Sequence, residues 1–381
     1  MHRPNDDIGK KPHTASGYPW RSVTQWMESL GLRALAGISA QSHYTFNRVS
    51  SLFVDEIIDA ATRTNYAQDV DRMHAFAGLV SLAASGARGV DGGNQLIFER
   101  MLNASGATVK RRSSGDVTGI MKLGNALDVQ QLGHLPSSAF LKRKEAGIAE
   151  LPLWWVGTRN GHGNLYDAVL VATPWHNAGI TLLNTDKVIP RYDFRRLHVT
   201  IVVTSAKHPD PVYFGHKKSY KIPRTILTTY VRERKEDENP TRFLSLSYVD
   251  MLRRNGRPVR EKGHPLHVVK LFSLQKLNDE NIEDLFGKHK VLWTYRKRWD
   301  SYPILDVTDK FGDFEVDTNL YNINAMERWV STMETSTVAA KNVVALLLEK
   351  WLGPKFVHGT NCHWNETSPA SDWAGWGCDS S

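Results

Sequence analysis

The chain has almost no cysteine and no long apolar run, and both scarcities exclude classes of structure. Its 381 residues include two cysteines, Cys362 and Cys378, both near the C-terminal end. So placed, they cannot form a disulfide framework for the rest of the chain. Their spacing from His358 and His363 matches no standard zinc pattern. No apolar run reaches the roughly 18 residues of a spanning helix. We therefore predict no metal site and no transmembrane segment.

The sequence also lacks the motifs of several common enzyme classes. A dinucleotide-binding turn reads G-x-G-x-x-G between a strand and a helix, because only glycine lets the backbone approach a pyrophosphate. Gly161 and Gly163 begin such a spacing, but Tyr166 stands where the third glycine is needed. A Walker loop and the G-x-S-x-G nucleophile elbow are both missing from the sequence, which argues against a hydrolase.

The chain is basic without a nucleic-acid motif. Its formal net charge is +8 and its pI about 9.3. The basic residues occur as scattered pairs and triplets, such as Arg111–Arg112, Arg253–Arg254 and Arg296–Arg298, with no zinc-finger or RNP pattern beside them. This scatter is typical of solvated surface charge, so we expect no nucleic-acid partner.

The order of the predicted elements indicates a mixed α/β protein. Residues 20–102 have helical patterns, and Ser22 is suited to cap a helix that Gly31 ends. Strands are predicted after residue 107, among them a buried strand over 165–173 and a half-buried one over 197–203. Consecutive strands without intervening helices favour a mixed or antiparallel sheet. A closing helix over 331–352 should bury Val344, Leu347, Leu348 and Trp351 and should end at Gly353.

Four short segments have the composition of binding turns. Arg63–Gln68 follows a helix, and Gly92–Gly93 precedes Asn94 at the start of another helix. Thr173–Pro174 ends the buried strand, and Ser331–Thr335 opens the closing helix. Paired glycines and helix starts present free N–H groups, which favour negative charge. Each segment alone has an ordinary structural explanation as a turn, a strand exit or a cap.

Seven blocks in order resemble one family, the prenylcysteine oxidases, also called prenylcysteine lyases. The similarity extends from about Phe53 to Leu352. The blocks are RTNYAQDVDRMHAFAGLVSLAAS (63–85), VDGGNQLIFERML (90–102), YDAVLVATPW (166–175), LHVTIVV (197–203), HVVKLFS (267–273), RKRWDSYP (296–303) and NLYNINAMERWVSTMETSTVAAKNVVALL (319–347).

The resemblance implies a flavin oxidoreductase acting on a sulfur group, with FAD as cofactor and a monoamine-oxidase-like FAD-binding fold. The implied substrate is farnesyl- or geranylgeranyl-cysteine, a product of prenylated-protein catabolism. Hydride leaves the isoprenoid carbon beside sulfur, water adds there, and collapse of the hemithioacetal gives cysteine and an isoprenoid aldehyde, with hydrogen peroxide from reoxidation. No protein nucleophile is needed and no catalytic side chain is assigned. The aromatic residues Trp175, Trp299 and Tyr302 are candidates for the isoprenoid pocket.

The resemblance also divides the chain and places the cofactor contacts. The predicted parts are a disordered lead-in (1–17), a helical substrate-domain segment with the glycine turn (18–105), a partial FAD-binding domain (106–195), a substrate domain (196–300), a closing FAD-domain segment with its helix (301–353) and an irregular tail (354–381). The predicted cofactor contacts are Gly92, Gly93, Asn94, Thr173, Pro174, Ser331, Thr332, Met333, Glu334 and Thr335.

The sequence departs from the family at its beginning. Family members open with a secretory signal and a glycine-rich FAD loop, and residues 1–17 contain neither. We therefore expect a fold that lacks its N-terminal βαβ unit. Three hypotheses follow: a shortened form of an active oxidase, a paralogue that binds or cyclises an isoprenoid without redox chemistry, or a non-catalytic isoprenoid-binding protein. The family is lysosomal or vacuolar, and the sequons at Asn103 and Asn365 agree with a glycoprotein. If the chain is complete as written, we expect it to be cytosolic.

Overall fold

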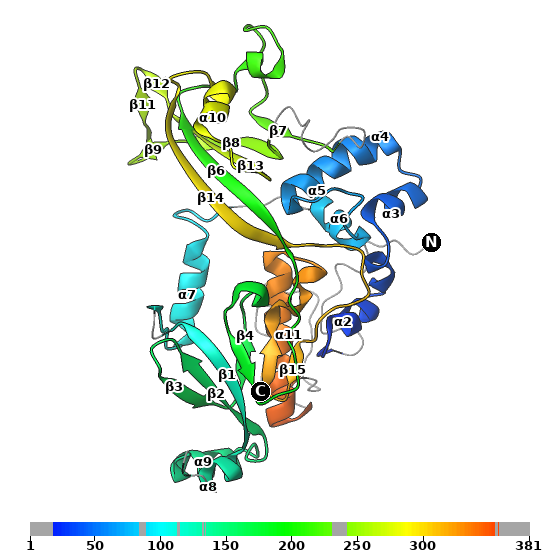
Figure 1. The fold of residues 1–381 in the computed structure, drawn as a ribbon, viewed down its shortest axis with the longest axis vertical. Coiled ribbons are helices and arrows are strands. Elements are labelled where there is room, and N and C mark those ends of the chain that lie inside the picture. Colours follow the sequence, from blue (N-terminus) through cyan, green and yellow to red (C-terminus); the bar gives the residue numbers. More distant parts are fainter. Residues whose placement is uncertain are drawn as a thin grey trace, which may run out of the picture. The chain divides into compact units, whose positions relative to one another are not determined.

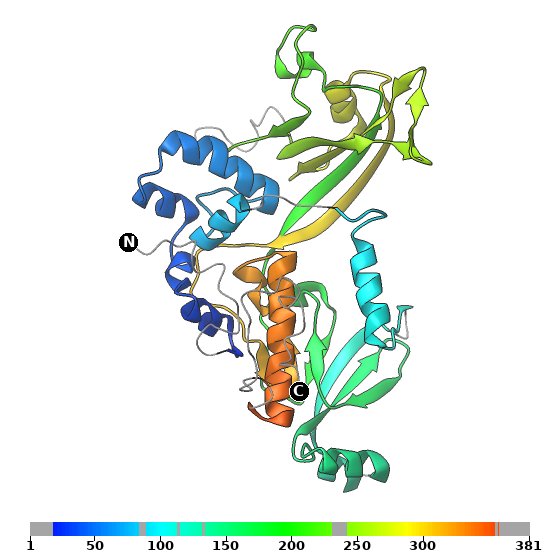
Figure 2. The same cartoon turned by 180° about the vertical axis from the view of Figure 1, so that it is seen from behind.

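The structure is a computed structural model that describes residues 18–83, 89–112, 115–131, 133, 135–230, 242–354 and 357. The chain divides into two compact units (Figures 1 and 2). Unit 1 comprises Met1–Arg33, Gly86–Tyr192 and Lys310–Ser381, and unit 2 comprises Ala34–Ser85 and Asp193–Asp309. The predicted lead-in, both cysteines, the histidines near them, the sequon at Asn365 and nearly all of the tail lie outside the described residues.

Unit 1 contains two small sheets and one long helix. A four-stranded sheet has the order β3-β2-β1-β5, in which only the β1–β5 pair is parallel. A three-stranded sheet has the order β15-β16-β4, in which β16 and β4 are parallel. The elements are α2 (Val23–Ser29), α7 (Gln95–Ser105), β1 (Val117–Asn125), α8 (Ala126–Gln131), α9 (Ser137–Glu145), β2 (Pro152–Thr158), β3 (Gly163–Tyr166), β4 (Val169–Val171), η5 (Trp175–Asn177), β5 (Thr181–Leu183), β15 (Glu315–Asp317), β16 (Leu320–Asn322), η8 (Ile323–Arg328) and α11 (Met333–Leu352).

The core of unit 1 is rich in tryptophan. Trp20 stacks on Trp26 at 5.3 Å between ring centroids, and Trp26 meets the edge of Trp329 at 5.0 Å. The backbone of Trp20 also exchanges two hydrogen bonds, each 2.8 Å long, with the buried amide of Asn342 on α11. Since Asn342 is fully buried, this paired amide fixes α11 against the segment before α2.

Unit 2 is built on a five-stranded antiparallel sheet of order β14-β6-β13-β8-β7. The helix α10 covers one face, where Val202, Leu246, Val269 and Leu271 form a buried cluster with Phe286. The elements are α3 (Ala40–Phe46), α4 (Ser51–Phe53), a π-helical turn η3 (Val54–Ile58), α5 (Asp59–Tyr66), α6 (Ala75–Leu82), β6 (Phe194–Thr204), η6 (Pro211–Phe214), β7 (Thr225–Leu227), β8 (Ser245–Met251), β9 (Arg253–Arg254), β10 (Arg257–Pro258), β11 (Arg260–Glu261), β12 (His264–Pro265), β13 (His267–Ser273), α10 (Asp279–Phe286) and β14 (Val291–Pro303); η2 (Arg33–Ala36) spans the boundary between the units.

A hydrogen-bonded polar network lies inside the helical part of unit 2. Asp59 accepts hydrogen bonds from the backbone N–H groups of Val70 and Tyr230, at 2.9 and 2.5 Å. Arg63 forms a buried ion pair with Asp69 at 2.6 Å. The segment Arg63–Gln68, singled out in the sequence, therefore ties α5 to the chain around it. Its polar side chains are explained by this packing.

The structure confirms the mixed α/β class and most helix ends, and it corrects two predictions. The predicted strand over 165–173 is two strands, β3 and β4, which belong to different sheets. The predicted buried stripe of α11 is also wrong, since Val344 is 46% exposed while Val343 and Leu346 are buried. The reason is that Asn342 pairs with the backbone of Trp20, so the buried residues of α11 are those around it: Ala339, Asn342, Val343, Ala345 and Leu346.

Candidate cofactor site

The N-terminus of α11 is the best-defined part of the predicted cofactor site. Thr332 and Thr335 form a capping box, in which each hydroxyl oxygen accepts from the other residue's N–H, at 3.1 and 3.2 Å. Within the described residues, the backbone N–H groups of Met333 and Glu334, in the first turn of α11, have no hydrogen-bond acceptor. Such an end is electropositive. The side chains of Met333 and Glu334 are exposed, so these residues can present their backbone to a ligand.

Two parallel strands end beside this helix start. Val171 of β4 pairs in register with Asn322 of β16. The turn Thr173–Pro174 therefore leaves β4 at the same sheet edge at which η8 leaves β16. The short helix η8 contacts both β4 and α11. Ligands of α/β folds bind at the carboxyl ends of parallel strands. The short helix η8 thus links the sheet edge that Thr173–Pro174 leaves to α11, which Ser331–Thr335 opens.

A titratable pair that the sequence analysis missed lies at this edge. Burial raises the pKa of the Glu327 carboxyl above its usual value, while a hydrogen bond with Asn324 and the nearby His176 oppose the rise. His176 follows Thr173–Pro174 in η5, and Glu327 is in η8. The two residues are 151 positions apart in the sequence. No local spacing indicated that they meet, although Glu327 lies within one of the blocks that carry the family resemblance and His176 directly follows another.

The glycine turn before α7 differs from its prediction. Gly92 and Gly93 have φ of 85° and 110°, conformations that glycine adopts readily. The N–H of Gly93 is not free, because it donates to the carbonyl of Val90 at 2.9 Å. The side chain of Asn94 accepts from the N–H of Val90 at 3.2 Å. The polar groups of Val90, Gly93 and Asn94 thus form hydrogen bonds with one another within the turn. Its assignment to the cofactor stays a prediction.

The three aromatic residues predicted for the isoprenoid pocket have different surroundings. Trp175 is half-buried and packs on the cluster around Ile120 in unit 1. Trp299 lies on β14 in unit 2 and is 51% exposed. Tyr302 is half-buried near the end of β14, and its ring meets the edge of Tyr66 at 5.5 Å. Their role in substrate binding stays a prediction.

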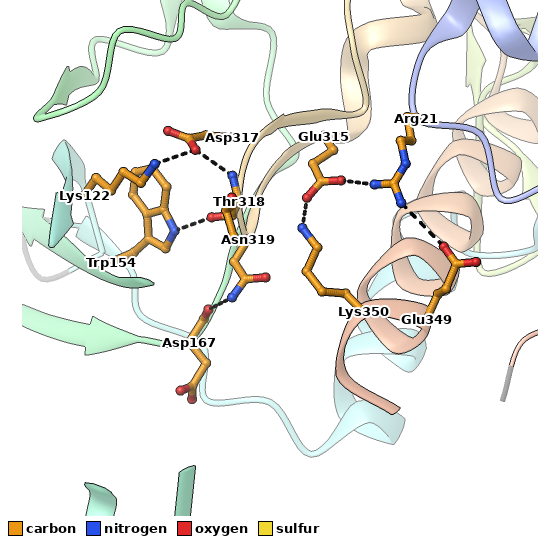
Figure 3. Close-up of polar contacts among 10 residues, drawn as sticks. All are labelled: Arg21, Lys122, Trp154, Asp167, Glu315, Asp317, Thr318, Asn319, Glu349 and Lys350. Carbon is orange, nitrogen blue, oxygen red and sulfur yellow. Dashed lines mark hydrogen bonds and ion pairs between the residues drawn. The ribbon is translucent and has the colours of Figure 1, made fainter. Parts of the chain in front are cut away.

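A second polar cluster in unit 1 surrounds β15 (Figure 3). Glu315 contacts both Lys350 and Arg21, and Arg21 also approaches Glu349 at 3.8 Å. Burial and the neighbouring Arg21 lower the pKa of Lys350 to about 8. The cluster borders a polar cavity of about 540 Å³. Its charges compensate one another and join α11 to β15 and to the segment before α2.

The turn after β15 is anchored to the four-stranded sheet (Figure 3). Asp317 accepts from Lys122 and Thr185, both at 2.6 Å. Burial alone would raise the pKa of Asp317, but these bonds and one from the N–H of Thr318 outweigh it and lower that pKa. The indole of Trp154 donates to the carbonyl of Thr318 at 3.0 Å. These bonds fix the β15–β16 hairpin, and through β16 they support the edge at which η8 begins.

The site at the start of α11 fits a flavin on the chemistry of its donors. A reduced flavin develops negative charge at its N1–C2 carbonyl edge, and free N–H groups at a helix end stabilise such charge. The described residues contain no group of three or more potential metal ligands close enough to share an ion. No helix among them has both the length and the apolar content to cross a membrane.

Comparison with known proteins places the chain in a family. The family profile described as prenylcysteine lyase matches residues 12–356, and the chain belongs to this family. Prenylcysteine oxidase 1 of Bos taurus is 28% identical over 347 residues, which cover 88% of this chain and 62% of that protein. Farnesylcysteine lyase of Arabidopsis thaliana is 27% identical over 327 residues, covering 84% and 54%. The chain thus spans less than two thirds of the length of these relatives.

A comparison of folds gives a more distant similarity. A double mutant of putrescine oxidase matches with a TM-score of 0.46 at 10% sequence identity. The match covers 82% of this chain and 69% of the other.

Proposed function

We propose that this member of the prenylcysteine lyase family binds FAD and oxidises the thioether of a prenylcysteine. The observation that carries the proposal is that η8, which follows β16, contacts both β4 and α11, while the first turn of α11 has free N–H groups. The names of the relatives suggest the substrate: prenylcysteine oxidase and farnesylcysteine lyase act on a cysteine that bears an isoprenoid chain. Bound FAD would supply the hydride acceptor.

The residues of the chain have two tasks in this reaction. The N–H groups of Met333 and Glu334 would hold the carbonyl edge of the flavin and favour its negative charge. Glu327 and His176 offer groups that can take and return a proton. Addition of water to the oxidised carbon releases one proton, and the departing cysteine sulfur needs one. Burial of Glu327 raises the pKa of its carboxyl and so favours the neutral form that can donate a proton.

An absorbance spectrum tests cofactor binding, and peroxide release tests the substrate. The purified chain, with FAD added, is expected to keep a flavin band after gel filtration. Farnesylcysteine should then release hydrogen peroxide and farnesal. Farnesol, which has the same chain without the thioether, is the matched control and should release neither. If no flavin is retained but farnesylcysteine still binds, the oxidase assignment fails and a non-redox isoprenoid-binding protein is supported.

A further inference from the structure

Two hairpins at one end of the sheet in unit 2 carry a net charge equal to half of the chain's formal net charge. The hairpins β9–β10 and β11–β12 carry five basic side chains and one carboxylate, a net charge of +4 in a chain of +8. All six are exposed. They are Arg253, Arg254, Arg257, Arg260, Lys262 and Glu261. Basic residues occur along the sequence as scattered pairs and triplets, but the two consecutive turns bring these five together.

The two hairpins hold these charges in a defined arrangement. Each turn has two consecutive residues with positive φ, Asn255–Gly256 and Lys262–Gly263, as in a tight type I′ turn. Arg253 and Arg260 donate to the carbonyls of Gly256 and Gly263, at 3.3 and 2.8 Å. Within the described part of the chain, Arg254, Arg257 and Lys262 form no ion pair. Three cations are therefore available to an external anion.

An exposed aromatic strip runs along β14 from the same end of the sheet. Its residues alternate on one face, with Trp293 53%, Tyr295 46% and Trp299 51% exposed and Lys297 between them. Trp293 pairs with Val203, Val203 with Val268, and Val268 with Asp250. The strip thus begins in the row of residues next to the hairpins. Leu292 and Val249, 42% and 53% exposed, add aliphatic surface at this end.

The geometry of the rings decides between two anionic partners. Binding of single-stranded nucleic acid uses open aromatic faces on which bases stack. Here Trp293 and Tyr295 stack on each other, with centroids 6.1 Å apart and planes 10° from parallel. The ammonium of Lys297 lies over Trp299, 5.1 Å from its centroid. A membrane interface suits such a surface, because Trp and Tyr insert among headgroups while Lys and Arg contact lipid phosphates.

We propose that this surface, made of the two basic hairpins and the aromatic strip of β14, docks unit 2 onto an anionic lipid bilayer. The charge complements acidic headgroups, with about a fivefold gain in partitioning for each basic residue near the surface. The rings and the two aliphatic residues anchor the contact in the headgroup layer. This inference does not rest on the proposed reaction, since it concerns a different surface and needs no cofactor.

Sedimentation of the full chain with vesicles tests the proposal. Binding is expected to vesicles of phosphatidylcholine mixed with phosphatidylserine, to weaken with salt, and to be much lower with phosphatidylcholine alone. The double variant Arg254→Gln with Arg257→Gln should bind about 25-fold more weakly, from two losses of about fivefold. Trp293→Ala should also weaken binding and should reduce the blue shift of tryptophan fluorescence on vesicle addition.

Matched variants test whether binding needs this surface in particular or only positive charge and exposed apolar side chains anywhere on the chain. Lys142→Gln with Lys144→Gln removes two exposed cations from α9 in unit 1, and Phe46→Ala removes an 87% exposed ring from α3. Both should bind vesicles like the parent chain. An equal loss in these controls, or absence of vesicle binding by the parent chain, would overturn the proposal. So would displacement of the vesicles by single-stranded DNA, which would assign the surface to nucleic acid.

Discussion

Asp59 is a buried carboxyl whose charge is poorly tolerated. It is 2% exposed, and burial raises its pKa from 3.8 to about 6, with Asp69 adding to the rise and the N–H groups of Tyr230 and Val70 opposing it. Since the folded state binds the proton more tightly than the unfolded state, Asp59 contributes stability below a pH of about 4. That contribution is lost as the pH rises through about 6.

We expect the free energy of unfolding to fall by up to about 3 kcal/mol across this pH range through Asp59 alone. Asp59→Asn should remove this slope, which urea titrations at several pH values would measure. Asp55→Asn, which changes an exposed carboxyl four residues before Asp59 in the same helical segment, should keep it. An unchanged slope in Asp59→Asn would show that this carboxyl is already charged in the folded protein.

Trp155 lies flat on two glycines of the β2–β3 hairpin. A Cβ atom on Gly163 would be 2.2 Å from the indole nitrogen of Trp155, and one on Gly157 would be 2.0 Å from the far end of the ring. Gly163→Ala should therefore cost about 1–3 kcal/mol of unfolding free energy, because the ring must move. Urea unfolding measures it. Gly89→Ala, with no atom within 4 Å, is the control.

The same substitution in a Trp155→Ala background tests whether the ring of Trp155 causes this cost. With the ring removed, Gly163→Ala should cost little, so the double-mutant cycle should give a coupling of similar size to the single effect. A cost that stays unchanged without Trp155 would locate the strain in the hairpin backbone.

At the scale of elements, α11 depends on its first turn. Thr332 and Thr335 satisfy two N–H groups at the end that the proposed function assigns to the flavin. Thr332→Ala should lower the free energy of unfolding by about 1 kcal/mol and weaken FAD retention, whereas Thr332→Ser keeps the hydroxyl and should be close to neutral. Urea unfolding and a flavin titration measure the two effects. If Thr332→Ala and Thr332→Ser gave equal unfolding free energies and equal FAD retention, the hydroxyl of the cap would contribute to neither.

At the scale of the whole molecule, the chain crosses four times between two compact units, each with its own core. Phe286→Ala empties a buried position under the sheet of unit 2 and should cost about 3–5 kcal/mol. Hydrogen exchange should then speed up in β8 and β13 while β1 and β2 keep their protection. Ile120→Ala should give the reverse pattern. Loss of protection in both units for either variant would show that they unfold together.

The sequence by itself determined the features that depend on neighbours a few residues away. Ser22 caps a helix as its local pattern predicted, because a cap joins a side chain to an N–H within one turn. The ordered motifs also indicated the family that the comparison then showed. Mixed α/β content followed from the order of the elements.

Only the tertiary structure decided which distant residues meet. Pairing Trp299 with Leu197 and bringing His176 to Glu327 both join residues that no local pattern relates. The break between β3 and β4 has the same origin, because one apolar run was divided by the partners of each half, Trp155 for Leu165 and Asn322 for Val171. An apolar run indicates that its residues are buried, but the partner strands determine the sheet to which those residues belong.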